Sequence, residues 1–404
     1  GTSWQERDLW CMELTNKAIP AEEKTGIGVF ANIHGGERES ASSAMYTAWW
    51  LALCSGDDYV KGLLDNYIIY VIPVINPDGY EQSFVINNRP NLRPRDANGD
   101  NIPYSDPYTD IDGDGFIATL YRGTADDTPS GDLPVFGMES PDWDENGILG
   151  DDPRTSGIDM NRTFDYQWNR YDIETKDGQQ VGNVNWTTAG TAPATEPEIK
   201  ALQQFLYEHE IDALVSLHTG IQSVLYPWCY RAYDANDPDD AEIPFMKETA
   251  AKMAQVFQDH TGRGFYSMSS NEDYPTAAEL IDYAYGRYNI HAYTIEVYSP
   301  GKSEDGDISA CKWENTMPEA KWVFYSRDEI RDVLGLAPDA ITDSEGVGLA
   351  ADEGLWFYTS PTNQMVNRAP EEQDVMVRGC RDAILTMIES EPSGSGYQNP
   401  GYYK

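Results

Sequence analysis

Residues 26–37 read GIGVFANIHGGE, an apolar run that ends in a histidine, two glycines and a glutamate. The β-branched and aromatic residues of this run are typical of a strand that is covered on both faces of a sheet. Polar residues directly after such a strand lie at its carboxyl end, which is where open α/β sheets bind their ligands. This stretch therefore predicts a central strand with a functional site at its end.

Three more runs share this pattern, and helical patterns separate them. The other strand-like runs cover residues 67–75, 212–217 and 291–297, and the helical patterns cover 39–54, 196–209, 241–260, 277–288 and 373–389. Strands that alternate with helices predict an α/β fold. We expect a mixed, largely parallel twisted sheet with helices on both faces and the functional site at the carboxyl ends of its central strands.

Two long segments interrupt the alternation of strands and helices. Residues 93–154 are acidic and rich in Gly and Pro, and residues 299–370 carry only short helical patterns such as 327–336. We interpret both segments as insertions into one domain that extends over residues 1–391. The Gly-, Ser- and Tyr-rich tail 392–404 is expected to be loose.

The composition separates the chain from several classes of protein. With 40% apolar and 12% aromatic residues among 404, the chain can form a packed core, and no apolar run reaches the length that spans a bilayer. The 68 acidic and 28 basic residues give a net charge of −40, which disfavours nucleic acid and anionic membranes as partners. Five scattered cysteines without a CxxC pair exclude a thiolate metal cluster. We expect a monomer, secreted or periplasmic, whose secretion signal lies upstream of this sequence.

A metal site is predicted at the ends of two strand-like runs. His34 and Glu37 follow the first run on a tight glycine turn, and His218 directly follows residues 212–217. The chain has only five histidines, so two of them at such positions are informative. Two histidines and one carboxylate with an open fourth position are the ligands of a catalytic Zn²⁺ site, where the metal activates a water molecule.

Catalysis at such a site also needs a general base that does not bind the metal. Glu296 is the best candidate, because it is a carboxylate within the otherwise apolar run 291–297. Burial beside a metal ion would adjust the pKa of its carboxyl group for proton transfer.

Five blocks of the sequence, in one order, resemble the zinc metallocarboxypeptidases of the carboxypeptidase A-like family. They are residues 34–37 (HGGE), 76–80 (NPDGY), 157–162 (GIDMNR), 217–220 (LHTG) with 225–227 (LYP), and 274–296, which includes IDYAY at 281–285. Each block is short, but five in the same order make the resemblance specific. It implies that a Zn²⁺-activated water hydrolyses the C-terminal peptide bond of a peptide that has a free C-terminus.

The resemblance also implies roles for individual residues. Asn161 and Arg162 would bind the C-terminal carboxylate, since a guanidinium group matches a carboxylate in shape. Asp159 would orient a ligand histidine. Tyr274 would close over the substrate and donate a hydrogen bond. An arginine would stabilise the oxyanion of the reaction, and we assign this role to Arg89.

Arg93 is the alternative to Arg89, because the alignment is loose around residues 89–93. The preference for the C-terminal residue also stays open. Ile281 matches the specificity position of the family and implies an apolar or aromatic side chain. Glu279 stands where family members usually have small residues, so its carboxylate would favour a basic side chain, and the net charge of −40 favours the same outcome.

Two other functions are compatible with the metal ligands. One is a related zinc amidohydrolase that acts on small acylated amino acids or on peptidoglycan stem peptides. The other is a catalytically inactive, peptide-binding homologue. Tyr274 and residues 281–283 favour a peptide pocket over the first, and the presence of Glu296 and Arg162 argues against the second.

The first insertion contains a possible calcium site. Asp110, Asp112 and Asp114 alternate with other residues and are followed by Gly115 and an apolar residue, as in the first half of a calcium loop. The twelfth position is Tyr121 instead of the glutamate that a complete EF-hand requires. The segment therefore predicts either structural Ca²⁺ or a solvated acidic turn.

Overall fold

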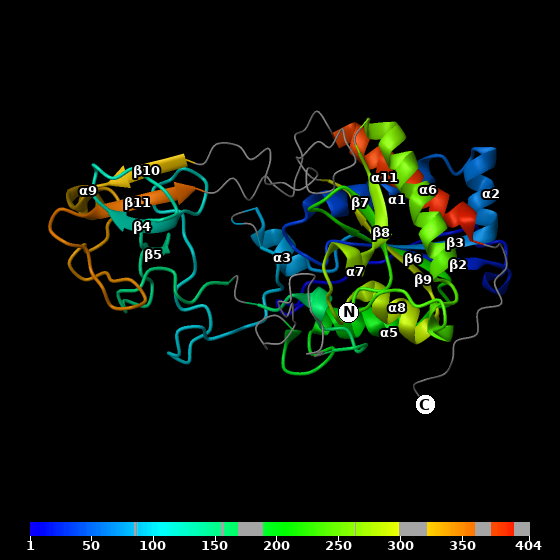
Figure 1. Ribbon diagram of the computed structural model, residues 1–404, viewed down its shortest axis with the longest axis horizontal. Helices are drawn as coiled ribbons and strands as arrows, with labels where there is room; N and C mark the ends of the chain where they lie inside the picture. The colour runs from blue at the N-terminus through cyan, green and yellow to red at the C-terminus, as the bar shows by residue number, and fades with distance from the viewer. Residues whose placement is uncertain are drawn as a thin grey trace.

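The computed structural model describes residues 1–84, 86, 88–154, 157–168, 189–262, 264–298, 321–359 and 373–391. Its main part is a seven-stranded sheet with the strand order β1-β3-β2-β6-β9-β7-β8 (Figure 1). The strands are β1 (Met12–Leu14), β2 (Thr25–Ala31), β3 (Tyr67–Ile72), β6 (Ala213–His218), β7 (Ser223–Tyr226), β8 (Tyr266–Ser269) and β9 (His291–Glu296). The central strands β3, β2, β6 and β9 are parallel, and β1 and β7 pair antiparallel with their neighbours β3 and β9. The predicted mixed, largely parallel sheet is thus confirmed.

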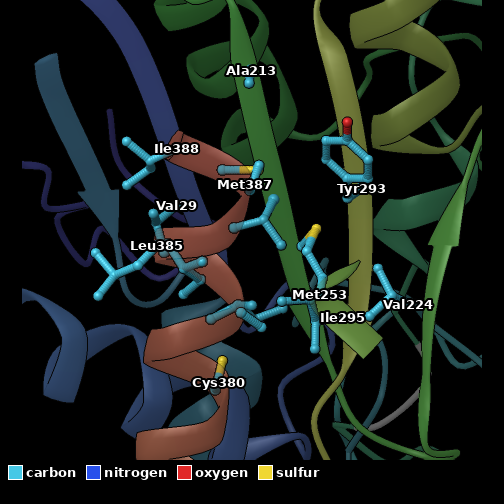
Figure 2. Packing of buried hydrophobic residues seen from close by; sticks show 14 of the residues in the cluster. Val29, Ala213, Val224, Met253, Tyr293, Ile295, Cys380, Leu385, Met387 and Ile388 are labelled. Atoms are coloured by element: carbon cyan, nitrogen blue, oxygen red, sulfur yellow. The ribbon is translucent and has the colours of Figure 1, made fainter. Parts of the chain in front are cut away.

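Helices cover both faces of this sheet. On one face lie α1 (Arg38–Leu53), α2 (Asp58–Asn66), α6 (Ile243–Thr261) and α11 (Gln373–Ser390), and on the other lie α5 (Pro197–Glu208) and α8 (Leu280–Tyr288). Successive strand residues point to opposite faces: Val29 packs in the first cluster and Phe30 in the second. Figure 2 shows α11 against the strands, with Met387 and Ile388 among the side chains of the first cluster.

The helices begin and end close to the predicted positions, with one clear difference. The pattern at residues 277–288 predicts a helix from residue 277, but α8 begins at Leu280. Ala278 has a left-handed backbone with φ of 58°, so it cannot be part of the helix. The Leu280 amide instead donates to the side-chain oxygen of Asn161 at 3.0 Å. The start of α8 is therefore attached to a residue that the sequence places in the functional site.

The two insertions contain strands that pair with each other. They are β4 (Thr119–Gly123), β5 (Val135–Met138), β10 (Lys321–Tyr325) and β11 (Gly354–Thr359), in the antiparallel order β10-β11-β4-β5. With α9 (Arg327–Asp332) they enclose a separate apolar cluster that includes Leu120, Ile330 and Phe357. Figure 1 shows this small lobe beside the main sheet. The sequence pattern of 93–154 did not indicate β4, because the partner β11 that stabilises this strand lies far along the chain.

Short elements complete the described part of the chain. They are η1 (Ala21–Glu23), α3 (Pro77–Gln82), η2 (Met160–Arg162), η3 (Pro238–Asp240) and α7 (Ser270–Asp273). Among all the residues that the structure describes, no helix is long and apolar enough to cross a bilayer. Four of the five cysteines are free thiols, and Cys311 lies outside the described residues, as do the tail 392–404 and parts of the second insertion.

Glu198, in the first turn of α5, is fully buried beside the N-terminal segment. It accepts hydrogen bonds from the Trp4 amide at 3.3 Å and from Asn91 Nδ2 at 3.4 Å. Burial raises the pKa of Glu198 to about 7. The folded protein thus binds the proton of the Glu198 carboxyl group more tightly than the unfolded chain does. The resulting stabilisation is present below the unfolded pKa of roughly 4.3 and is lost as the pH rises through about 7.

Substitution of Glu198 by glutamine is expected to remove this pH dependence. At about pH 8 the E198Q variant should be more stable than the parent by up to about 3 kcal/mol, because glutamine cannot become a buried anion. Denaturant unfolding of both proteins between about pH 5 and pH 8 measures the difference. An advantage of the same size at both ends of this range would contradict the assignment.

Candidate active site

Three potential metal ligands meet at the carboxyl ends of β2 and β6. Because these strands are adjacent and parallel, their ends lie at the same edge of the sheet. His34 follows β2, Glu37 precedes α1, and His218 is the last residue of β6. Glu37 Oε1 is 2.8 Å from His34 Nδ1, and Glu37 Oε2 is 3.0 Å from His218 Nδ1. The two Nδ1 atoms are 3.2 Å apart, and all three side chains are buried.

The outer nitrogen of each histidine has its own polar partner. His34 Nε2 is 3.1 Å from Asp159 Oδ1, and His218 Nε2 is 3.0 Å from Ser216 Oγ. Partners of this kind fix the ring and direct the inner nitrogen at a metal. Two inward imidazole nitrogens and one carboxylate are the donor set of a catalytic zinc site. The residues present therefore fit Zn²⁺.

The two histidines also influence the ionisation of Glu37. Burial raises the pKa of its carboxyl group, but the neighbouring His34 and His218 outweigh burial and hold this pKa well below its usual range. Glu37 is consequently ionised, which is the form that binds a metal.

A close contact between two turns sets the position of the ligand motif. A Cβ atom on Gly35 would lie 2.2 Å from the carbonyl carbon of Gly79, so only glycine fits there. Asn76 holds the second turn, because its side chain accepts from the Gly79 amide at 2.9 Å and donates to the Ile33 carbonyl at 3.3 Å. The turn at residues 76–79 therefore packs against residues 33–35 and fixes the position of the HGGE turn.

Glu296 is the last residue of β9 and lies directly beside His218 in the sheet. Its Oε2 atom is shielded from solvent and has no hydrogen-bond partner among the described residues. Burial raises the pKa of Glu296 to about 8, although His218 opposes this shift. A carboxyl group with a raised pKa is suited to accepting a proton and releasing it again.

A cavity of about 290 Å³ connects the metal ligands with Glu296 and with the predicted substrate-binding residues. Its lining comprises His34, Glu37, Arg89, Asn161, Arg162, His218, Thr219, Gly220, Ile221, Leu225, Ser270, Asp273, Tyr274, Glu279, Thr294 and Glu296. The structure thus brings together all predicted catalytic, metal-binding and carboxylate-binding residues. Asp273 was missed in the sequence, although it is an acid directly before Tyr274.

Arg89 and Arg93 occupy different environments. Arg89 lines the cavity, and its Nε donates to Asp159 Oδ2 at 2.8 Å. Burial would raise the pKa of Asp159, but Arg89 and His34 hold it well below its usual range. Arg93 instead donates to the buried Glu196 at 2.9 Å and does not line the cavity. The geometry therefore favours Arg89 for the oxyanion role.

Arg162 has three partners among the residues that line the cavity, one of which is the Asn161 carbonyl, 2.9 Å from Nη1. Its Nη1 donates to Glu279 Oε1 at 2.8 Å, and its Nη2 donates to the Tyr274 hydroxyl at 3.0 Å. Burial opposes the charged form of Arg162, but Glu279 raises the pKa of the guanidinium above its ordinary value. Tyr274 is 44% exposed, so the ring borders the mouth of the cavity. Arg162 is thus fully charged and held in place.

Two residues, Glu279 and Ile281, were considered as determinants of the preferred C-terminal residue. Glu279 directly precedes α8, and Ile281 lies in its first turn. Ile281 is 1% exposed, packs in the apolar cluster on the α5 and α8 face of the sheet, and does not line the cavity. Glu279 does line it. The expectation that Ile281 forms a pocket wall is therefore not met, because α8 begins late and directs this side chain into the core.

A parallel α/β sheet that carries two histidines and a glutamate at its strand ends, with a further carboxylate beside them, has the arrangement of a zinc-dependent hydrolase. The chain belongs to the zinc carboxypeptidase family, whose family model matches residues 1–317. Human carboxypeptidase A6 is 30% identical over 311 residues, which cover 74% of this chain and 54% of that protein. Zinc carboxypeptidase A 1 of Drosophila melanogaster is 24% identical over 294 residues, or 72% of this chain and 53% of that protein. The chain spans about half the length of the curated relatives it matches.

Solved structures show the same fold. The crystal structure of thrombin-activatable fibrinolysis inhibitor superimposes with a TM-score of 0.51 at 18% identity, covering 73% of this chain and 59% of that chain. The bovine protein of the same name, in complex with tick carboxypeptidase inhibitor, gives a TM-score of 0.50 at 18% identity and covers 77% of this chain and 83% of that one. These likenesses confirm the predicted fold.

The predicted calcium residues also lie together, at the edge of the small lobe. Asp110, Asp112 and Asp114 have ligand oxygens within 4.8 Å of one another. Asp110 accepts from two glycine amides of its own loop, and Tyr325 donates to Asp112 Oδ2 at 3.0 Å. The loop is therefore connected to β10 by a hydrogen bond.

Proposed function

We propose that this protein is a zinc-dependent metallocarboxypeptidase that hydrolyses the C-terminal peptide bond of peptides. The observation that carries this proposal is the position of Arg162. This charged guanidinium group lies on the wall of the same cavity as His34, Glu37 and His218. A peptide whose C-terminal carboxylate binds at Arg162 would place its last peptide bond near the metal ligands.

His34, Glu37 and His218 would hold the zinc ion. When bound, zinc lowers the pKa of water and polarises a carbonyl group. Glu296 would take a proton from the attacking water molecule and pass it to the leaving amine, from its position beside His218 on the cavity wall. Asp159 would keep the His34 ring in its orientation.

The remaining residues would bind and orient the peptide. Arg162 and Asn161 would hold the terminal carboxylate, with Tyr274 at the mouth of the cavity as a further hydrogen-bond donor. Arg89 would stabilise the negative charge that develops on the scissile carbonyl oxygen, from its position between Asp159 and Glu37.

Amino-acid release from N-blocked peptides tests the proposed reaction. The protein loaded with Zn²⁺ should release the last residue only, chelation should abolish the release, and added Zn²⁺ should restore it. Cleavage of peptidoglycan stem peptides or small acylated amino acids alone would favour a related amidohydrolase. Binding of peptides without any release would indicate an inactive homologue.

We also propose that Asp110, Asp112 and Asp114 bind a structural Ca²⁺ ion. Their converging carboxylates and the hydrogen bond from Tyr325 support this proposal. Added Ca²⁺ should then raise the melting temperature of the parent but not that of a D112N variant. A D126N variant changes an acid outside this loop and serves as the control.

We infer further that the protein acts as a monomer outside the cytoplasm. The net charge of −40 supports the absence of nucleic-acid and membrane partners. Light scattering should give a mass near the 45.3 kDa of one chain. Fractionation of the producing cells tests the location, and recovery in the cytosol would contradict it.

A further inference from the structure

We propose that Glu279 makes this enzyme select peptides whose C-terminal residue carries a positively charged side chain. This inference rests on the proposed carboxypeptidase function, of which it names the substrate class.

The carboxylate of Glu279 is held by several groups on the cavity wall. Arg162 Nη1 lies 2.8 Å from its Oε1, and Asn161 Nδ2 lies 3.4 Å from its Oε2. The Thr276 hydroxyl donates to Oε1, and Cys229 Sγ lies 3.4 Å from Oε2. Glu279 is 7% exposed, so the carboxylate belongs to the inner part of the cavity.

The backbone around Glu279 is also fixed. The carbonyl of Ala278, whose φ is 58°, accepts from the Phe164 amide at 3.1 Å. The amide of Leu280 donates to Asn161. These hydrogen bonds hold the residues on both sides of Glu279, so its carboxylate stays beside Arg162.

A bound peptide would bring a second carboxylate to the same guanidinium group. Arg162 would then face the carboxylate of Glu279 and the C-terminus of the substrate at once. One of the two negative charges would lack a counterion in a largely buried place, which is unfavourable. A cationic side chain on the terminal residue would supply the missing positive charge. An apolar side chain would not.

The other charges of the cavity support the same conclusion. Of the two arginines that line it, Arg89 is already bonded to Asp159. Asp273 adds a second acid to the lining beyond the metal ligands and Glu296. A cationic terminal side chain therefore has complementary charges in this cavity.

An alternative role for Glu279 is that of an internal competitor, which competes with the C-terminal carboxylate of the substrate for Arg162. In that case its carboxylate would occupy Arg162 and weaken the binding of every substrate by the same factor, whatever the terminal side chain. The two roles differ in the ratio between a charged and an uncharged substrate of the same shape.

The test compares N-blocked peptides that end in lysine or in norleucine, which differ by the ammonium group. The parent should hydrolyse the lysine peptide with a kcat/KM about 100-fold or more above that of the norleucine peptide. The E279Q variant should lose most of this ratio. The charge-matched control is E272Q, an exposed acid that does not line the cavity, and it should keep the ratio.

Each other outcome is decisive. If the parent hydrolyses the lysine and norleucine peptides with nearly equal kcat/KM, the proposal is wrong. This outcome needs no variant, so the test remains valid even if E279Q does not fold. An equal gain for both peptides in E279Q favours the internal competitor. If no peptide is hydrolysed, the carboxypeptidase function fails, and calorimetric binding of the two peptides to the parent still tests selection by Glu279.

Discussion

Replacement of Glu296 by glutamine is expected to lower kcat by about 10³-fold, which is the usual contribution of a general base. Glutamine has nearly the same shape, but it cannot accept the proton of a water molecule. Since Glu296 lies beside His218 without being part of the histidine and Glu37 cluster, zinc content should stay unchanged. The KM for the peptide should change little.

Steady-state kinetics and metal analysis of the same preparation check this prediction. The E272Q variant again controls for the lost negative charge. An E296Q protein that keeps more than a tenth of the parent kcat would contradict the role of Glu296. Loss of zinc together with activity would instead indicate that Glu296 supports the metal site.

Substitution of Arg162 by methionine is expected to have an effect of similar size on a different parameter. The kcat/KM for peptides with a free C-terminus should fall by about 10²- to 10³-fold, because a partner of a buried, charge-assisted pair is removed. Peptides with an amidated C-terminus lack the carboxylate, so their slow hydrolysis should be unaffected. The ratio between the two kinds of peptide measures what Arg162 recognises.

Removal of Arg162 should also lower stability, and a second substitution separates this effect from recognition. Arg162→Met leaves the carboxylate of Glu279 without its ion-pair partner, at a cost of about 3 kcal/mol or more. In the double variant with Glu279→Gln that charge is gone, so stability should recover while activity does not. Recovery of activity in the double variant would show that Arg162 serves only to neutralise Glu279.

The sequence was most informative about site residues that directly follow a strand-like run, because the local pattern alone indicates them. His34 and Glu37 lie on one turn after β2, and His218 ends β6, so apolar runs that end in polar residues were sufficient to find them. Their meeting follows from the parallel pairing of β2 and β6. The alternation of strands and helices predicts parallel strands, but it does not predict which of them are neighbours.

The sequence was least informative where the partner lies far along the chain. The ion pair of Arg162 with Glu279 depends on the late start of α8, which the helical pattern does not reveal. β4 has a short and partly polar pattern, and its partner β11 begins at Gly354. Such pairings become visible only when the whole chain is folded.

The pairing of β4 with β11 also has a consequence for synthesis on the ribosome. The three strands that carry the candidate site, β2, β6 and β9, are all complete by Glu296, but β4 must wait for residues 354–359. The end of β4 at Gly123 and the start of β11 at Gly354 are about 230 residues apart, so at translation rates of roughly 5–20 residues per second β4 waits about 10–50 s. During that time we expect the edge of β4 that later pairs with β11 to be unpaired, and therefore to be where chaperones act on this chain.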